Sequence, residues 1–232
     1  METSLGFVQG SLMLGSTHGF VSSAAINRVP VAKTAPSARN SVVMNTDFKF
    51  YRGSLNNTRA NQVEWYLKEL KKAPRADYDE IRLDTKQSEH KDNRKNPHPF
   101  MKVPSLMVGD AVIFESGALL LYLQRKYDSQ GLSELQLGEI SSWVFWANAS
   151  FGPGIISERT RESTVESLGV IDAIVAKRQY LTSADRLTAA DIAVVYLIEG
   201  VKKFIPFDTS KFTNLNKYVQ RLTSSDSYKS SI

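Results

Sequence analysis

Residues 102–123 read KVPSLMVGDAVIFESGALLLYL, and this stretch decides the fold. Two short apolar runs, residues 104–108 and 111–114, are separated by Gly109-Asp110, a dipeptide typical of tight turns. We therefore predict a β-hairpin. A helix is predicted to begin at Ser116, because apolar residues recur beyond it at helical spacing.

Pro104 stands at the entrance to the first of these strands. Proline has no backbone N–H and removes a donor from the sheet, so ordinary strand pairing is not expected there. Bonds that precede such prolines are often cis. The start of the helix offers free N–H groups and a positive dipole end, which suit a carboxylate. The sequence thus predicts a site for a small peptide, with backbone pairing at Val103 and carboxylate capture at Glu115 and Ser116.

This arrangement resembles the glutathione site of glutathione S-transferases. The resemblance extends over roughly residues 47–230 and is carried by several segments in the right order. Three of them look most like the chi class described from cyanobacteria, namely RANQVEWYLKEL (59–70), EHK (89–91) and WVFWANASFGPG (143–154).

The resemblance implies roles for the residues of the hairpin. It implies a cis bond between Val103 and Pro104, and pairing of the Val103 backbone with the cysteinyl part of glutathione. Glu115 and Ser116 would hold the γ-glutamyl end. Lys102 precedes the proline where the family often has a residue that contacts the glycyl carboxylate.

The first half of the chain reads as an α/β thioredoxin-like domain, residues 46–127. Residues 47–51 alternate as a strand, 60–70 have helical spacing, and 78–84 form a second strand. Residues 86–95 are highly charged and are predicted to be a short helix or a loop. The hairpin and its helix then complete a mixed sheet with helices on both faces.

The second half reads as an all-α C-terminal domain, residues 132–232. It follows a polar linker at 127–132, and beyond this linker only helical periodicity is present. We predict one long helix over residues 133–151, broken at Gly152-Pro153-Gly154. A second helical run is predicted over about residues 158–177.

A capping box precedes a later apolar helix. Thr188 takes the N-cap position and Asp191 lies three residues beyond it. The superfamily carries this box at the same place, where it is a folding element. We therefore assign both residues to stability and not to chemistry.

A glutathione transferase must ionise a thiol that titrates near 8.5, and lowering that pKa by two units requires about 2.7 kcal/mol. Aligned on the family, the usual serine position falls on Asn57, which is not a hydroxyl, and we count it among the glutathione-binding residues. Ser54, Thr58 and Tyr51 remain as possible hydroxyl donors. Arg59 matches an arginine at the helix start that helps to ionise the thiol in several classes, so we predict that it stabilises the thiolate.

Each of these assignments has a structural alternative. Arg59 could form a surface or inter-domain salt bridge, and Tyr51 is favoured as a core residue at the end of a strand. The family places its electrophile pocket between the domains, where Trp146, Phe151 and Ile155 are candidate lining residues. An aromatic stripe at helical spacing is, however, more often part of the core.

Composition excludes several classes of function. The net charge of +5 is modest, and no Lys/Arg run is dense enough to indicate nucleic-acid binding. No apolar run is long enough to span a bilayer. The chain has no cysteine, which excludes disulfides, thiolate–zinc sites and the branches of the superfamily that use a catalytic cysteine. His18, His90 and His98 are not spaced as ligands and are interpreted as surface or loop residues, so no metal is predicted.

Residues 1–45 differ in composition from the rest. Glu2 is their only acid, and Ser, Ala and Val dominate beside Arg28, Lys33 and Arg39. This composition is typical of an organelle transit peptide. We predict delivery to the chloroplast stroma of an alga-like organism, with a disordered tail on a cytosolic protein as the alternative.

These features together predict a two-domain, homodimeric glutathione S-transferase. It would use glutathione as co-substrate and join its thiolate to small electrophiles, as in detoxification and stress defence, with no metal, nucleic acid or membrane partner. The rival hypothesis is a non-catalytic binding or scaffold protein in a plastid assembly. The missing serine at Asn57 favours the rival, and the two readings differ in whether Arg59 must face the peptide site.

Overall fold

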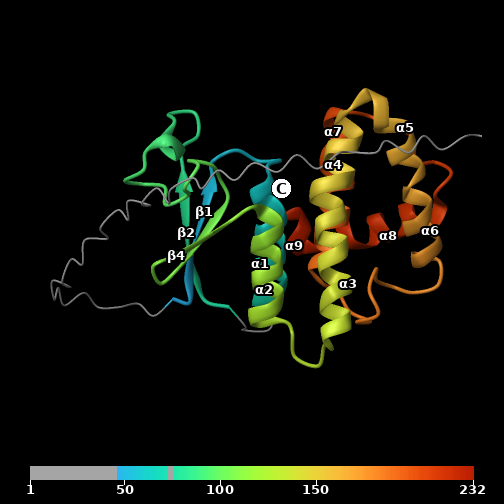
Figure 1. Ribbon diagram of the computed structural model, residues 1–232, viewed down its shortest axis with the longest axis horizontal. Coiled ribbons are helices and arrows are strands. Elements are labelled where there is room, and N and C mark those ends of the chain that lie inside the picture. Colours follow the sequence, from blue (N-terminus) through green and yellow to red (C-terminus); the bar gives the residue numbers. More distant parts are fainter. Residues whose placement is uncertain (1–45, 73–75) are drawn as a thin grey trace, which may run out of the picture. The chain divides into compact units, whose positions relative to one another are not determined.

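A computed structural model of the chain describes residues 46–72 and 76–232 (Figure 1). The predicted targeting segment, residues 1–45, lies outside the described residues. In chain order the elements are β1 (Phe48–Gly53), α1 (Arg59–Lys71), β2 (Tyr78–Leu83), the 3₁₀ turn η1 (Glu89–Lys91), β3 (Ser105–Val108), β4 (Ala111–Phe114), α2 (Ser116–Tyr127), α3 (Glu134–Phe145), the π-helical turn η2 (Trp146–Phe151), α4 (Gly152–Ile156), α5 (Glu158–Glu166), α6 (Leu168–Val175), α7 (Ala189–Phe204), α8 (Thr213–Thr223) and α9 (Asp226–Lys229).

The strands form one mixed sheet in the order β2-β1-β3-β4. β1 and β2 are parallel, with Phe48 opposite Tyr78. β3 runs antiparallel to both of its neighbours, and Ser105 pairs with Tyr51 on one side and Phe114 on the other. The thioredoxin-like architecture predicted from the sequence is confirmed.

Alternation along β1 directs one set of side chains toward α1 and α2, which lie side by side (Figure 1). Phe48 and Phe50 are buried there as expected of an amphipathic strand. Arg52 is also buried, and its guanidinium forms an ion pair with Glu64 of α1. The sheet therefore contacts α1 through an apolar layer that contains one charged pair.

The predicted break of the long helix at Gly152-Pro153-Gly154 is wrong. Helical backbone continues from α3 through η2 and α4, and the chain leaves it only at Ser157. Pro153 lies in the first turn of α4, directly after the π-helical turn η2, and its missing N–H does not end the helix there. The run predicted over residues 158–177 is instead divided into α5 and α6 at Ser167.

α7 forms the centre of the helical part. Its residues 189–198 are all buried, and it contacts α1, α2 and α3. The predicted capping box is present, since the Asp191 carboxylate accepts hydrogen bonds from the Thr188 N–H (2.9 Å) and hydroxyl (3.0 Å). It also accepts from the Leu181 N–H (2.9 Å) and the Tyr218 hydroxyl (2.7 Å), so the box ties neighbouring segments together.

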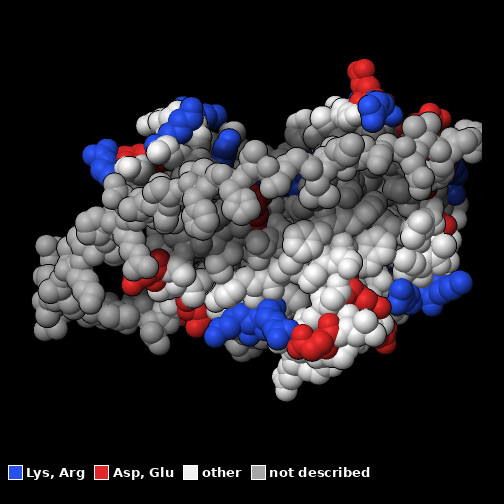
Figure 2. Space-filling model, in the orientation of Figure 1, with Lys and Arg blue, Asp and Glu red and all other residues white. Residues whose placement is uncertain are grey.

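The thioredoxin-like and helical parts are joined by buried polar contacts. Tyr196 of α7 donates a hydrogen bond to the carbonyl of Thr58 (2.6 Å), and the Ala189 N–H donates to the Gln124 side chain (2.9 Å). Across the face shown in Figure 2, basic and acidic side chains lie side by side and form no continuous basic surface among the described residues. No helix in residues 46–72 or 76–232 is long and apolar enough to cross a membrane.

Candidate glutathione site

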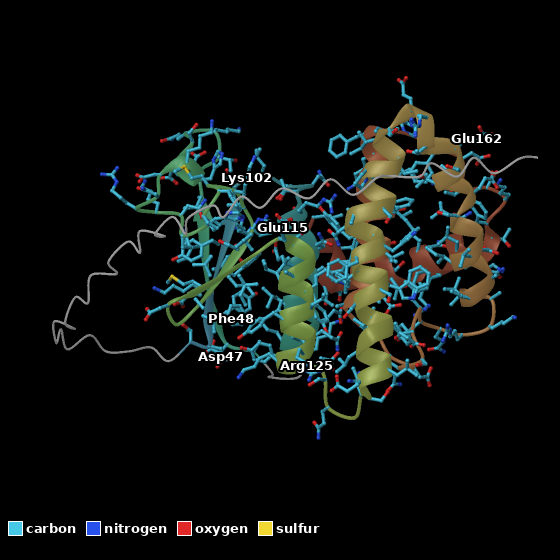
Figure 3. The ribbon with its side chains drawn as sticks, in the orientation of Figure 1. Asp47, Phe48, Lys102, Glu115, Arg125 and Glu162 are labelled. Atoms are coloured by element: carbon cyan, nitrogen blue, oxygen red, sulfur yellow. The ribbon has the colours of Figure 1, made fainter. Side chains whose placement is uncertain are left out.

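The loop before β3 holds the Val103–Pro104 bond in the cis form, as the resemblance implies. Asn96 fixes this loop, because its Nδ2 atom donates to the carbonyls of His90 (2.7 Å) and Lys102 (2.9 Å). Pro104 is buried, whereas Lys102 is exposed. In Figure 3, Lys102 and Glu115 lie at the same end of the sheet, away from Phe48.

Val103 lies just beyond the end of strand pairing, which begins at Ser105. Within residues 46–72 and 76–232, no hydrogen bond engages the backbone N–H or carbonyl of Val103. Gly53 makes room for it, since a Cβ atom there would lie 3.3 Å from Cγ2 of Val103 and 2.8 Å from Cγ2 of Thr85. The Val103 backbone is therefore available to pair with an extended peptide in the manner of an added strand.

Glu115 and Ser116 form the turn from β4 into α2. Glu115 is exposed and adopts a φ of 68°, a conformation that costs free energy in residues other than glycine and that clusters at ligand sites. The Ser116 hydroxyl is buried, accepts from Nε2 of Gln62 (2.9 Å) and donates to Oδ1 of Asn148 (3.3 Å). The first N–H groups of α2 lie beside these two side chains, which favours binding of a carboxylate.

Arg59, the first residue of α1, reaches across to the helical part. Its Nη1 atom donates to Oδ1 of Asn148 at 2.6 Å. The guanidinium would lie 3.1 Å from a Cβ atom at Gly152, so a glycine at this position leaves it room. Burial lowers the pKa of Arg59, and the nearby charge of Glu115 partly opposes that effect. A permanent cation thus lies beside the Glu115-Ser116 turn.

Family profiles match both halves of the chain. The glutathione S-transferase N-terminal domain matches residues 49–125, and the glutathione S-transferase C-terminal domain matches residues 152–226. The chain belongs to the glutathione S-transferase family. It carries the family's cis-proline loop, its Glu-Ser turn and its capping box in the expected order.

Among curated relatives, glutathione S-transferase F10 of Arabidopsis thaliana is 29% identical over an alignment of 120 residues, and the match covers 41% of this chain and 55% of the relative. A trimodular acetylaranotin synthesis protein, ataIMG of Aspergillus terreus, is 24% identical over 54% of this chain and 15% of its own length. The matched region therefore spans about half of the first relative and a small part of the second.

Solved structures share the fold. The glutathione transferase URE2P5 of Phanerochaete chrysosporium has a TM-score of 0.64 at 23% identity, and the match covers 80% of this chain and 93% of that one. Ure2p in complex with glutathione has a TM-score of 0.67 at 21% identity, covering 81% and 98%. At this level of identity the likeness establishes the glutathione S-transferase fold and nothing finer.

Two of the three candidate hydroxyl groups, those of Thr58 and Ser54, already have hydrogen-bond partners. The Thr58 hydroxyl donates to Oδ1 of Asn61 (3.2 Å) within the cap of α1, and Ser54 Oγ lies 3.2 Å from Oγ1 of Thr85. Tyr51 is only 8% exposed, and burial raises the pKa of its hydroxyl, which suits the alternative of a core tyrosine. Asn57 is exposed at a φ of 57° and accepts a hydrogen bond from Lys203 of α7 (2.8 Å).

The predicted electrophile-pocket residues pack together. Phe151 and Ile155 are fully buried, and the rings of Trp146 and Phe151 lie 5.2 Å apart. Trp146 alone is partly exposed, so it is the member of this group that could contact a ligand directly. For Phe151 and Ile155 the geometry matches the alternative of an aromatic and aliphatic core.

His98 corrects one expectation about the histidines. It lies in a loop as expected, but its side chain is buried between Phe100 and Phe114, and its Nδ1 atom accepts from the Phe100 N–H (3.1 Å). Burial lowers the pKa of this imidazole. Among the described residues, no group of three or more His, Asp or Glu side chains could hold a metal ion.

Sequence reasoning missed Asn148, which connects Arg59 and Ser116, and Gln62, which donates to Ser116. Asn148 lies within the quoted segment 143–154, but a π-helical turn changes which residues face the site and cannot be read from a 3.6-residue period. Gln62 lies inside α1 with no unusual sequence signal. Only tertiary contacts identify both residues. Asn148 contacts Arg59 and Ser116 across the two halves of the chain, and Gln62 contacts Ser116 between α1 and α2.

Proposed function

We propose that the protein is a glutathione transferase that joins the thiolate of bound glutathione to small electrophiles, in a detoxifying or stress-defence role. The observation that carries the proposal is the placement of the Arg59 guanidinium beside the Glu115-Ser116 turn, with the unpaired backbone of Val103 available to the tripeptide. The thiolate would attack the electrophile directly. Without a cysteine in the chain, no enzyme disulfide or thioether intermediate would form.

The residues divide the work between binding and activation. The Val103 backbone would pair with the cysteinyl part of glutathione, while Glu115 and Ser116 would hold the γ-glutamyl group. Arg59 would lower the thiol pKa, since a cation within a few ångströms typically lowers the pKa of an acidic group by about one to three units. Lys102, which is exposed at the loop, would meet the glycyl carboxylate.

The decisive experiment measures the ultraviolet absorption of bound glutathione thiolate as a function of pH. It compares the unchanged protein with the variant Arg59→Ala. The pKa of the bound thiol is expected to lie well below 8.5 and to rise by about one unit or more in the variant. Arg125→Ala is the matched control, because Arg125 is exposed at the far end of α2 (Figure 3) and pairs with Glu134 (3.2 Å), away from the proposed site. Failure to bind glutathione, or an unshifted thiol, would refute the transferase proposal.

A non-catalytic binding or scaffold role is the second candidate. It is favoured by the hydroxyls of Thr58 and Ser54, which are already hydrogen-bonded, and by Asn57, which binds Lys203 across the two halves. A scaffold would tolerate Arg59→Ala without loss of partner binding. The same titration therefore separates the two candidates.

We also propose a homodimer, whose contact surface would be the outer face of α3. Exposed residues recur at positions 135, 138, 142 and 145 of α3 and at position 149 of η2, and none of these five is charged. Leu135 is 76% exposed and Phe145 is 62% exposed, which is unusual for large apolar side chains unless they meet a partner. Sedimentation of Phe145→Asp should give a monomer, whereas Phe204→Asp, at an exposed site on α7, should leave the dimer intact.

Two further proposals concern the glutathione transferase class of the protein and its location in the cell. The segments 59–70 and 143–154 support a chi-like class, and the acid-poor composition of residues 1–45 supports import into a chloroplast. A fluorescent fusion that carries residues 1–45 should enter plastids of an algal cell. A fusion that stays in the cytosol would contradict the proposed address.

A further inference from the structure

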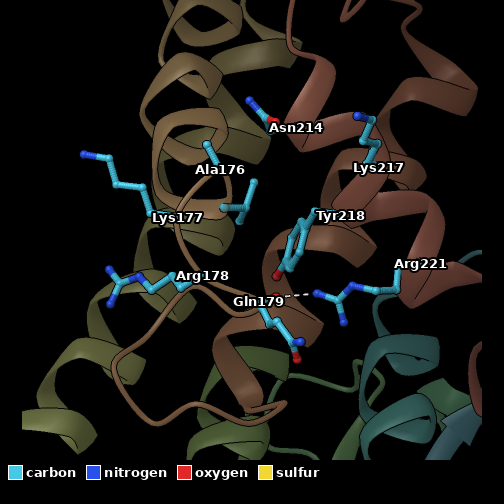
Figure 4. Close-up of a pocket in the computed structure, with 9 residues that line it drawn as sticks. Ala176, Lys177, Arg178, Gln179, Asn214, Lys217, Tyr218 and Arg221 are labelled. Carbon is cyan, nitrogen blue, oxygen red and sulfur yellow. Dashed lines mark hydrogen bonds between the residues drawn. The ribbon is translucent and has the colours of Figure 1, made fainter.

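A concave site of about 390 Å³ lies between the turn that follows α6 and the outer side of α8 (Figure 4). Val175 and Tyr218 form part of its wall. It shares no residue with the candidate glutathione site, whose residues lie in the β1–α1 region, the β3 loop and the start of α2. Its volume is at the lower end of the range for small-molecule pockets.

All charged residues that line this pocket are basic. Lys177 and Arg178 come from the end of α6, and Lys217 and Arg221 lie one turn apart on α8. Within the described parts of the chain, Lys177 and Lys217 form no ion pair and no side-chain hydrogen bond. Four basic side chains line one small pocket from two walls, and their mutual repulsion is unfavourable unless an anion or solvent compensates it.

Arg221 is already held in place. Its guanidinium donates to the carbonyl of Gln179 and stacks on two rings, with its carbon 5.1 Å from the Tyr180 centroid and 5.7 Å from the Tyr218 centroid. An arginine fixed in this way loses little side-chain entropy when its remaining N–H groups bind an oxyanion.

Lys177 and Arg178 extend outward from the turn in Figure 4, whereas Arg221 points toward Gln179. Both outward side chains are exposed, and exposed side chains change rotamer within nanoseconds. They can therefore turn toward a bound anion. Lys217, on the facing wall, is also exposed.

Nearby negative groups reduce the positive potential without cancelling it. The Asp172 carboxylate is occupied by the Leu215 N–H (2.8 Å) and by Nδ2 of Asn214 (3.0 Å). Glu139 interacts electrostatically with Arg178. The negative end of α6 also faces this region, but it amounts to only about half a charge.

We propose that this pocket binds a small polyanion of the phosphate class, such as a diphosphate or a phosphorylated metabolite. A fixed arginine fork with three mobile cations matches several oxyanion charges better than one carboxylate, because a single exposed ion pair contributes little. The inference is independent of the proposed transferase activity, since it uses none of the residues of the glutathione site.

The test is calorimetric titration of the full chain with inorganic pyrophosphate at low and moderate salt. The double variant Lys217→Gln/Arg221→Gln is expected to weaken binding about tenfold or more. The control Lys126→Gln/Lys229→Gln removes the same charge elsewhere, at the ends of α2 and α9, and should bind as the unchanged chain does.

Because Arg221 also holds Gln179, a second variant protects the test from a folding defect. Lys177→Gln/Lys217→Gln removes two exposed, unpaired cations and should also weaken binding several-fold while leaving thermal stability unchanged. A parallel titration with a sugar monophosphate distinguishes a metabolite from a bare diphosphate. Absence of pyrophosphate binding, or equal binding by both pocket variants and the control, would overturn the proposal.

Discussion

The carboxamide of Asn148 connects two residues that would handle glutathione, Arg59 and Ser116. Its Oδ1 atom accepts from Arg59 (2.6 Å) and from Ser116 (3.3 Å), while its Nδ2 atom donates to the Val144 carbonyl (2.9 Å). Because both ends of the amide are engaged, its orientation is fixed and the guanidinium of Arg59 is directed toward the site. Asn148 is therefore a positioning residue.

Asn148→Ala should release the Arg59 guanidinium and weaken its effect on a bound thiol. A hydrogen bond to a charged group contributes about 1.5–3 kcal/mol, so we expect roughly a tenfold loss of kcat/KM in a conjugation assay. The bound thiol pKa should rise, but less than in Arg59→Ala. Ser142→Ala on α3 is the control, since its hydroxyl donates to the Gly138 carbonyl within the same helix (3.0 Å). An unshifted thiol pKa in Asn148→Ala would contradict the role of Asn148.

The ion pair between Arg52 and Glu64 is buried on both sides, at 1% and 4% exposure. Removing one member leaves an uncompensated charge in the interior. Glu64→Gln should therefore lower the free energy of unfolding by about 3 kcal/mol.

The matched comparison for Glu64→Gln is the double variant Arg52→Met/Glu64→Leu, which removes both charges and retains volume. It should recover most of the lost stability in chemical denaturation, because a buried pair often contributes no more than apolar packing does. A double variant that is less stable than Glu64→Gln would mean that the pair itself stabilises the fold.

At the scale of elements, the turn η2 shows how one irregular helical turn serves the site. Its wider spacing keeps Ala147 and Phe151 in the core while Asn148 faces α1. π-helical turns are uncommon and are often found at functional sites. This turn joins α3 and α4 without the break that a Gly-Pro-Gly sequence predicts.

The capping box of α7 gives a prediction about stability alone. Thr188→Ala should lower the free energy of unfolding by about 1–2 kcal/mol, because it removes the hydroxyl of the cap. Asp191→Ala should lower the free energy of unfolding by about 3 kcal/mol or more, because it also leaves the Leu181 N–H and the Tyr218 hydroxyl without their acceptor. Thermal or urea unfolding measures both; equal costs for the two variants would show that the links to Leu181 and Tyr218 contribute nothing.

At the scale of the whole molecule, the two halves share their polar contacts through α1. Tyr196 of α7 binds the Thr58 carbonyl, and near the end of the chain the Ser231 carbonyl accepts from Asn61. Tyr228 of α9 packs on Trp65 with ring centroids 4.9 Å apart. Because both halves contribute to one interior, we expect them to unfold together.

Buried tyrosines make this folded unit sensitive to alkali. Burial raises the pKa of Tyr78 and of Tyr228 to about 12 from 10.0. The unfolded chain loses these protons first, so the stability that these two tyrosines contribute should be fully present below about pH 10 and should be lost between about pH 10 and 12. Urea unfolding at a series of pH values measures how the free energy of unfolding falls with pH, and the slope should correspond to nearly one proton per tyrosine. Tyr78→Phe should make this slope smaller. An unchanged slope in that variant would exclude Tyr78 as a source.

The local elements could be predicted from nearby residues alone. The turn at Gly109-Asp110, the helix start at Ser116 and the box at Thr188 and Asp191 each depend on residues within a few positions of one another. Local backbone preferences and hydrogen bonds act over that range, so the order of elements and the thioredoxin-like architecture could be predicted. The Val103-Pro104 loop could be predicted for the same reason.

Tertiary structure alone decided the contacts made by those elements. Arg59 meets Asn148 across 89 positions of sequence, and the buried partner of Arg52 is a glutamate on a neighbouring helix. Packing also determined that Phe151 and Ile155 lie in the core, although their helical spacing allows either a core or a pocket. Such contacts depend on how two surfaces meet, and a single chain's periodicity gives the face of an element but not the partner of each side chain.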